Sequence, residues 1–305
     1  LPLINLSEYK DPVISILKEM LDSNVVTAAD YEGYFSKFFL EARMEYRQML
    51  AKSRTKAMED ARKEEEGRSD YYYNNSNSEF VGDIPDYLEL LIPFWGEKPA
   101  VKEFVTQVAN EGDLSLRFAA LKQLVKKGQP VSTATLDTLA ANVKYRYRLY
   151  SYLTNQNKIQ LFPVRYNNQR DLAESRIYLG TYTKVDSLVY LDRVLVDDKG
   201  RKGYVYFFKY LSDKKGNAWK LATVGLVPVD PKKFVFEGTS KKVQEYFNNG
   251  WKLVDDVADD TFTELSSSRW VADDPLKTQI EKQIRKMKVK NSRSGQRFYD
   301  SDEEY

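Results

Sequence analysis

The hydrophobic pattern of this chain changes its period near Asn155. Before that point apolar residues recur every three or four positions, as on one face of an α-helix, whereas after it they alternate with polar residues, as in a β-strand. Helices and sheets bury their apolar faces in different ways. The pattern therefore predicts an α+β protein: an α-helical array over residues 1–154, then a small antiparallel β-meander domain over 155–265, and finally a basic amphipathic helix with a disordered acidic tail over 266–305.

The first part contains several helix patterns separated by turn-forming residues. A long amphipathic run follows Thr27, and it loses its apolar face after Leu50, which predicts a solvated, fraying extension over residues 51–66. Residues 67–82 show no period and are rich in turn formers, which predicts an exposed loop. Further helices are expected at residues 11–21, 84–94, 99–109, 114–127, 133–141 and 143–153.

The clearest strand pattern is a three-stranded meander. Its strands are expected at residues 187–196, 204–211 and 218–226, separated by polar connections that contain glycine. Aromatic residues lie at both alternating sets of positions from Tyr204 to Leu211, which predicts a sheet that is covered on one face and partly wet on the other. Weaker patterns predict strands at 158–166, 177–183 and 234–236, a short helix at 240–247 and a helix at 275–289.

The absence of histidine and cysteine excludes most catalytic machinery. No disulfide, zinc finger, haem ligand, thiol nucleophile or Ser-His-Asp triad can form without these residues. Neither a Walker sequence nor a glycine triplet between a strand and a helix occurs. Acidic pairs such as those at residues 255–260 lack the spacing of a calcium loop. We therefore expect no catalytic residues, no metal and no cofactor.

Charge and hydropathy limit the partners. The chain has 47 basic and 45 acidic residues, so nucleic acid is disfavoured as a partner. No apolar run approaches the roughly 20 residues of a transmembrane helix. The opening six residues are too short for a signal peptide, so we expect a piece of a longer protein. The absence of cysteine favours an extracytoplasmic location, in the periplasm or cell envelope.

Two groups of side chains are candidates for binding. The first could stack on a sugar or contact a partner protein, and comprises Tyr71, Tyr72, Tyr73, Trp95, Arg117, Trp219 and Trp251. The second is a basic patch on the helix at 275–289, comprising Lys282, Arg285, Lys286, Lys288 and Lys290. We expect the apolar stripe of this helix to lie on the β domain, while an anionic membrane or a nucleic acid is the alternative contact.

One helix pair resembles a known repeat. Residues 113–124, followed by Gly128, have an Asp at the turn, Arg117 four residues later, and then Ala119, Ala120 and Leu124. This order resembles the second helix of a HEAT repeat, and the preceding helix at 99–109 would be its partner. The resemblance covers one repeat, residues 99–128, and implies stacked helix pairs whose concave surface binds proteins or peptides.

The order of the helical half is also similar to the C-terminal regions of large Bacteroidota proteins of the TraB/GumN type. The metalloprotease chemistry of that family cannot be transferred to a chain without histidine. We therefore expect a non-enzymatic protein-binding or scaffolding module in a larger bacterial envelope-associated protein. One alternative is a carbohydrate-active hydrolase with two carboxylates beside Trp219 or Trp251, and another is nucleic-acid binding through the C-terminal basic helix.

Overall fold

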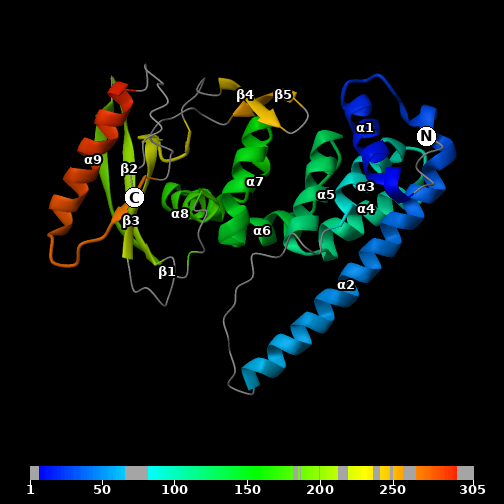
Figure 1. Ribbon diagram of the computed structural model, residues 1–305, viewed down its shortest axis with the longest axis horizontal. Coiled ribbons are helices and arrows are strands. Elements are labelled where there is room, and N and C mark those ends of the chain that lie inside the picture. Colours follow the sequence, from blue (N-terminus) through cyan, green and yellow to red (C-terminus); the bar gives the residue numbers. More distant parts are fainter. Residues whose placement is uncertain are drawn as a thin grey trace. The chain divides into compact units, whose positions relative to one another are not determined.

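The computed structural model confirms the α+β architecture, with helices first and an antiparallel sheet after them (Figure 1). It describes residues 7–65, 82–180, 185, 187–198, 200–211, 219–235, 241–247, 250–256 and 266–293. The chain divides into two compact units, Leu1–Leu139 and Ala140–Tyr305. The second unit includes two helices, α7 (Val143–Asn155) and α8 (Gln169–Gly180), as well as the strands.

The first unit contains the helices that the periodicity predicts. These are α1 (Lys10–Asp22), α2 (Phe35–Glu65), α3 (Ile84–Leu91), α4 (Pro99–Glu111), α5 (Leu114–Lys126) and α6 (Thr133–Ala141). The last two residues of α6 belong to the second unit. The first unit also contains the 3-10 segments Ser7–Tyr9, Ala28–Tyr34 and Ile92–Phe94. Side chains fix several helix starts. Thr27 and Asp30 form a capping box, and the Asp113 carboxylate accepts a hydrogen bond from the Leu116 N–H at 2.9 Å.

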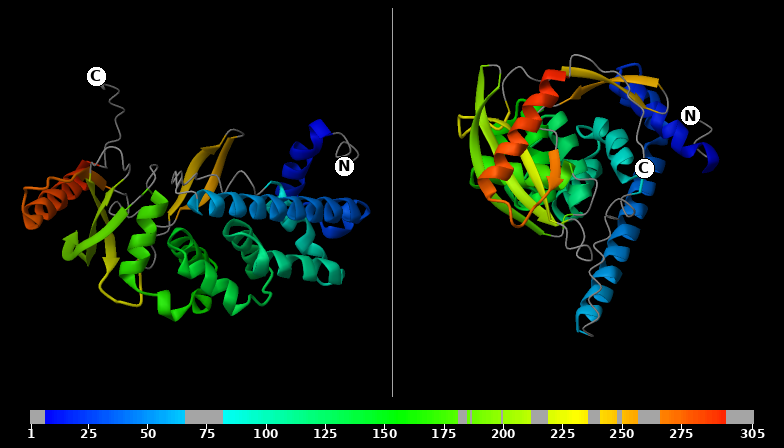
Figure 2. Two further views of the ribbon diagram at one scale, coloured as in Figure 1. Left: turned by 90° about the horizontal axis from the view of Figure 1, so that it is seen from below. Right: turned by 60° about the vertical axis from the view of Figure 1, so that its left-hand side comes forward.

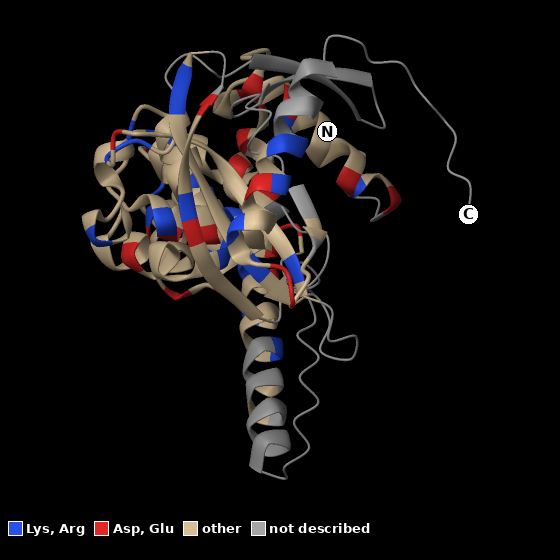
Figure 3. Cartoon of the chain, turned by 90° about the vertical axis from the view of Figure 1, so that its left-hand side faces the viewer, with Lys and Arg blue, Asp and Glu red and all other residues tan. Residues whose placement is uncertain are grey.

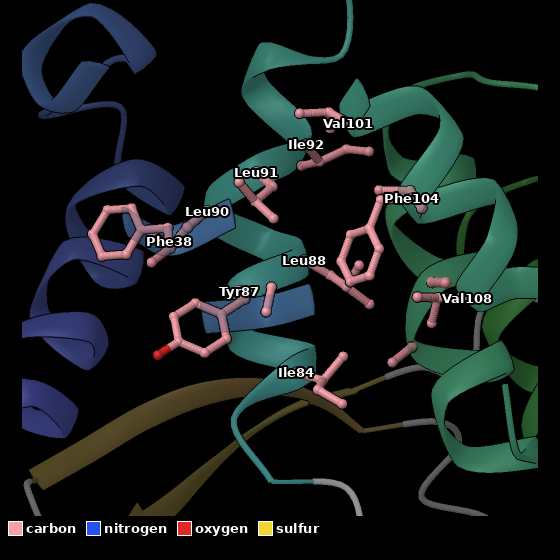
Figure 4. Close-up of a cluster of buried hydrophobic side chains, with 14 of the residues drawn as sticks. Phe38, Ile84, Tyr87, Leu88, Leu90, Leu91, Ile92, Val101, Phe104 and Val108 are labelled. Carbon is pink, nitrogen blue, oxygen red and sulfur yellow. The ribbon is translucent and has the colours of Figure 1, made fainter. Parts of the chain in front are cut away.

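The core of the first unit lies between α2, α3 and α4. Phe38 and Tyr87 are fully buried and lie with their ring centres 6.3 Å apart. Figure 4 shows Phe104 and Val108 of α4 pointing toward Leu88 of α3. Burying such side chains stabilises the fold by about 1.5–3 kcal/mol each, so this cluster fixes the first half of α2 against α3 and α4.

The second half of α2 extends past this core. Its buried residues end at Met49, and from Ala51 onward every described side chain is exposed. The helix nevertheless continues to Glu65, so the predicted extension after Leu50 is helical (Figures 1 and 2). At 1.5 Å per residue, the part from Ala51 to Glu65 is about 22 Å long.

The second unit is built on a four-stranded antiparallel sheet. Its order is β1 (Ser187–Asp198), β2 (Arg201–Leu211), β3 (Trp219–Pro228) and β6 (Ser266–Arg269). The predicted three-stranded meander is confirmed, and β6 adds a short fourth strand beside β3. A separate antiparallel hairpin consists of β4 (Lys241–Phe247) and β5 (Gly250–Asp256).

Helices cover both faces of this sheet at β2 and β3. Val205 and Phe207 form a core with Ile280 of α9 (Leu276–Arg293), as the apolar stripe of that helix predicts. On the other face the Tyr206 hydroxyl donates to Gln169 Oε1 of α8 at 2.8 Å, and Tyr206 is 2% exposed. The expectation of a partly wet face is therefore wrong for these two central strands.

Two predicted strands before the meander are wrong. Residues 158–166 form two 3-10 turns, Ile159–Leu161 and Val164–Tyr166, because Pro163 offers no N–H and the neighbouring amides bond to carbonyls three residues back. Of residues 177–183, the described ones belong to the end of α8. Leu172, Ala173 and Ile177 are buried at helical spacing, and this burial stabilises the helix.

Two assignments after the meander also change. Residues 240–247 were expected to be helical, but 241–247 form β4, whose register pairs Phe247 with Gly250. Phe234 and Val235 form a bend and not a strand, since Phe234 packs edge-on against Tyr147 and Tyr150. The predicted loop at 67–82, apart from Gly82, and the predicted acidic tail after Arg293 lie outside the described residues.

Candidate functional site

Three large apolar side chains are exposed on the side of α2 opposite the core. Leu40 is 60% exposed, Met44 49% and Met58 72%. Positions 40, 44 and 58 are separated by near-whole numbers of helical turns, so these side chains lie on one side of the helix. The buried residues Phe38 and Ala42 lie on the opposite side. We call the exposed residues Leu40, Arg43, Met44, Arg47 and Met58 the α2 face.

The charges on the α2 face have one sign. Arg43 and Arg47 are exposed beside the apolar side chains, and the described exposed residues of α2 include no acidic residue. The Arg43 guanidinium lies 5.6 Å from the centre of the Phe39 ring, which holds it close to the helix surface. The α2 face therefore combines exposed apolar side chains with positive charge.

Two acidic residues of α2, Glu41 and Glu45, lie on a different side of the helix. Glu41 and Glu45 lie 3.4 and 3.5 Å from the Lys10 ammonium, which also lies 3.3 Å from Asp83. The Tyr87 hydroxyl donates to Glu41. This cluster connects the starts of α1 and α3 to the middle of α2, so it fixes the orientation of the helix and therefore the direction of the α2 face.

Protonation states in this cluster are coupled. Burial lowers the pKa of Lys10, but Tyr87, Glu41 and Glu45 outweigh it and raise the pKa above its ordinary value. Burial and the Asp83 carboxylate raise the pKa of Glu45, against the Asp83 N–H and Lys10. With a lysine among its carboxylates, the cluster has the composition of a structural ion-pair network.

A second candidate lies in the second unit, beside α9. A pocket of about 370 Å³ is lined by Leu221, Ser268, Val271, Asp274, Gln279, Lys282, Gln283, Arg285 and Lys286. Leu221 and Gln283 are almost fully buried, whereas Lys282, Arg285 and Lys286 are exposed at its mouth. The pocket thus has a buried floor and a basic rim.

The structure brings together part of the predicted basic patch. Lys282, Arg285 and Lys286 all line the α9 pocket. Lys288 and Lys290 lie on the same helix, but the structure does not describe their side chains. In the view of Figure 3, basic and acidic residues are interspersed among the described residues. At this pocket three basic residues accompany one acidic residue, Asp274.

Two of the predicted binding residues serve the first unit's own fold. Trp95 is half-buried against the core of that unit. The Arg117 Nε donates to the Gly112 carbonyl at 2.6 Å, so this side chain holds the turn between α4 and α5. Tyr71, Tyr72 and Tyr73 lie outside the described residues.

The alternative of a carbohydrate-active hydrolase would need carboxylates beside Trp219 or Trp251. Beside Trp219 the structure places a lysine, with the Lys209 Nζ 4.9 Å from the ring centre of Trp219 and 5.5 Å from that of Trp270. Trp251 belongs to β5, and the structure does not describe its side chain. Within the described ranges, no group of three or more His, Cys, Asp or Glu side chains could hold a metal.

Sequence reasoning missed the α2 face and most of the α9 pocket. A helix wheel of residues 35–65 does place Leu40, Met44 and Met58 together, opposite the core positions. The contribution of Ser268 had no comparable signal, because β6 is only four residues long and pairs with a strand far away in the sequence.

Comparisons with known proteins do not assign the chain to a family. No family, no curated protein and no solved structure matches the chain. The resemblances to a HEAT repeat and to TraB/GumN-type regions stay predictions. Among the helices of the described segments, none combines the length and apolar character needed to cross a membrane.

Proposed function

We propose that the chain is a non-enzymatic protein-binding module and that the α2 face is its binding surface. The observation that carries the proposal is the position of Leu40, Met44 and Met58 on the side of α2 that points away from the core. Exposed apolar side chains that gather on one surface, rimmed by polar ones, are typical of protein interaction sites. A helix that extends beyond its own core can also enter a groove of a partner.

The shape and charge of the α2 face define the partner. Leu40 and Met44 are one turn apart and offer adjacent anchors, and methionine adapts to irregular surfaces. The basic residues Arg43 and Arg47 would contact the rim of the interface, where arginine is common. The partner surface is therefore an apolar groove or helix face with acidic residues along its edge.

The introduction of acidic residues on the α2 face tests the proposal. The intact chain, the double variant L40E/M44E and the control V25E serve as matched baits for partners from native extract, identified by mass spectrometry. Val25 is 67% exposed and lies outside α2, so V25E adds an acid at a comparable apolar position elsewhere in the same unit. Circular dichroism establishes that all three proteins keep their helix content.

The expected result is a protein that the intact chain and V25E retain and the double variant loses. Loss of even one buried anchor costs an interface about 2 kcal/mol or more, so retention should fall by more than about tenfold. Equal retention by all three baits would contradict the role of the α2 face. Recovery of nucleic acid or glycan in place of a protein would contradict the proposed function itself.

A further inference from the structure

The α9 pocket has the features of a site for a small anionic ligand. Three cations, Lys282, Arg285 and Lys286, and one carboxylate, Asp274, line it, so its charge is positive. The Lys282 Nζ lies 3.0 Å from Asp274 Oδ2. Arg285 and Lys286 have no carboxylate partner within the part of the chain that the structure describes.

Buried amides fix the walls of this pocket. Gln279 is 6% exposed, and its Nε2 donates to the carbonyls of Val271 and Asp274, both at 2.8 Å. Its Oε1 accepts from the Val271 N–H at 3.2 Å. These bonds hold the segment before α9 against the helix. The rim residues therefore start from a preformed backbone, which lowers the entropic cost of binding.

We propose that this pocket binds a small phosphate ester, with its phosphate at Lys282, Arg285 and Lys286 and its organic part on Leu221 and Val271. An arginine fork and two ammonium groups suit a tetrahedral oxyanion, and the Ser268 hydroxyl supplies a further hydrogen-bond donor. The volume of about 370 Å³ falls at the lower end of ordinary ligand sites. This inference does not depend on the α2 face.

Asp274 makes the proposal specific. Its carboxylate neutralises Lys282 and repels an incoming phosphate. Replacing it by Asn removes the negative charge but keeps the backbone carbonyl that accepts from Gln279. We therefore expect D274N to bind a phosphate ester more tightly than the natural chain, although it loses an ion pair.

Titration calorimetry with phenyl phosphate tests the site in the intact chain, with inorganic phosphate as a second probe. The variants are R285Q, K286Q and D274N, with K277Q as the matched control. Lys277 is exposed on the same helix and does not line the pocket, so K277Q removes the same charge outside the site. Phosphatidylglycerol vesicles and a single-stranded oligonucleotide test the other sources of phosphate.

The expected result is saturable binding of phenyl phosphate that R285Q and K286Q each weaken about tenfold. D274N should strengthen it several-fold, and K277Q should change it less than about twofold. Binding of phenyl phosphate that exceeds binding of inorganic phosphate would confirm the role of Leu221 and Val271.

Three results would overturn the proposal. An equal effect of K277Q and R285Q would mean that only the general charge of α9 attracts the probe. Binding of vesicles or of the oligonucleotide without binding of phenyl phosphate would assign the surface to a membrane or to nucleic acid. If none of the probes gave a heat of binding, the pocket would not be a ligand site.

Discussion

Two buried tyrosines of the first unit differ in one hydrogen bond, and this difference predicts opposite effects of the same mutation. Tyr46 is 2% exposed, and its hydroxyl has no hydrogen-bond partner in the described structure. Tyr31 is 1% exposed and donates to the Leu90 carbonyl at 2.8 Å. Both rings pack edge-on against phenylalanines, Tyr46 against Phe104 and Tyr31 against Phe94, so replacement by Phe leaves the ring contacts in place.

The magnitudes follow from the cost of an unpaired buried polar group. Such a group costs about 1–3 kcal/mol, and a formed hydrogen bond contributes about 1 kcal/mol. We expect Y46F to raise the free energy of unfolding by about 1 kcal/mol, because it removes the unpaired hydroxyl. We expect Y31F to lower it by about 1–2 kcal/mol, because it removes the donor to Leu90.

Urea unfolding followed by circular dichroism measures both effects. Hydrogen exchange of peptides from α2 and α3 then assigns the change to the first unit, because Tyr46 belongs to α2 and Tyr31 donates to Leu90 of α3. A Y46F protein that is less stable than the natural chain, or a Y31F protein of unchanged stability, would refute the reasoning from hydrogen-bond satisfaction.

Burial of the Tyr46 hydroxyl also predicts that the free energy of unfolding depends on pH. Burial raises the pKa of Tyr46 to about 12, from an ordinary value of 10.0. The folded state therefore keeps a proton that the unfolded state releases between pH 10 and pH 12. Ionisation of Tyr46 leaves the free energy of unfolding unchanged below pH 10 and lowers it as the pH rises through 12. The stability advantage of Y46F should widen over this interval, as unfolding curves at pH 9 and pH 11 would show. A constant difference would contradict the raised pKa.

Two further substitutions test the second unit by urea unfolding. The Q169A variant leaves the Tyr206 hydroxyl and three backbone carbonyls without their side-chain partner, and should cost about 2–3 kcal/mol; a cost below about 0.5 kcal/mol would mean that these bonds contribute little. In G225A the new Cβ would lie 2.7 Å from the Tyr204 carbonyl oxygen, which predicts a loss of about 1–3 kcal/mol. The matched control is G96A, whose Cβ meets no atom within 4 Å, and an equal loss in both would contradict the steric argument.

Much of the fold follows from local patterns. The helices of the first unit and the three central strands could be predicted because each has a clear hydrophobic period and is bounded by turn residues. The errors fall where distant contacts decide. Residues 241–247 can be read with a helical period, but they become β4 because they pair with β5 across the two residues Asn248 and Asn249. Ile177 stays helical because α8 lies against α7 and β3, and these contacts are not local in sequence.

The candidate sites could be predicted only in part. The basic residues of α9 were visible as a charge run, but the pocket that Lys282 and Arg285 share with Ser268 depends on the pairing of β6 with β3. The apolar residues of the α2 face share a helical period, but only the structure shows that this side of α2 is exposed.

Photo-cross-linking from the α2 face tests the central claim most directly. A photoreactive phenylalanine analogue replaces Met44 in one protein and Val25 in a control, and both are irradiated in native extract. The account predicts that position 44 forms an adduct with a defined protein and that L40E abolishes it, while position 25 gives no such adduct. The same adducts from both positions, or none from position 44, would contradict the claim that this face of α2 binds a partner.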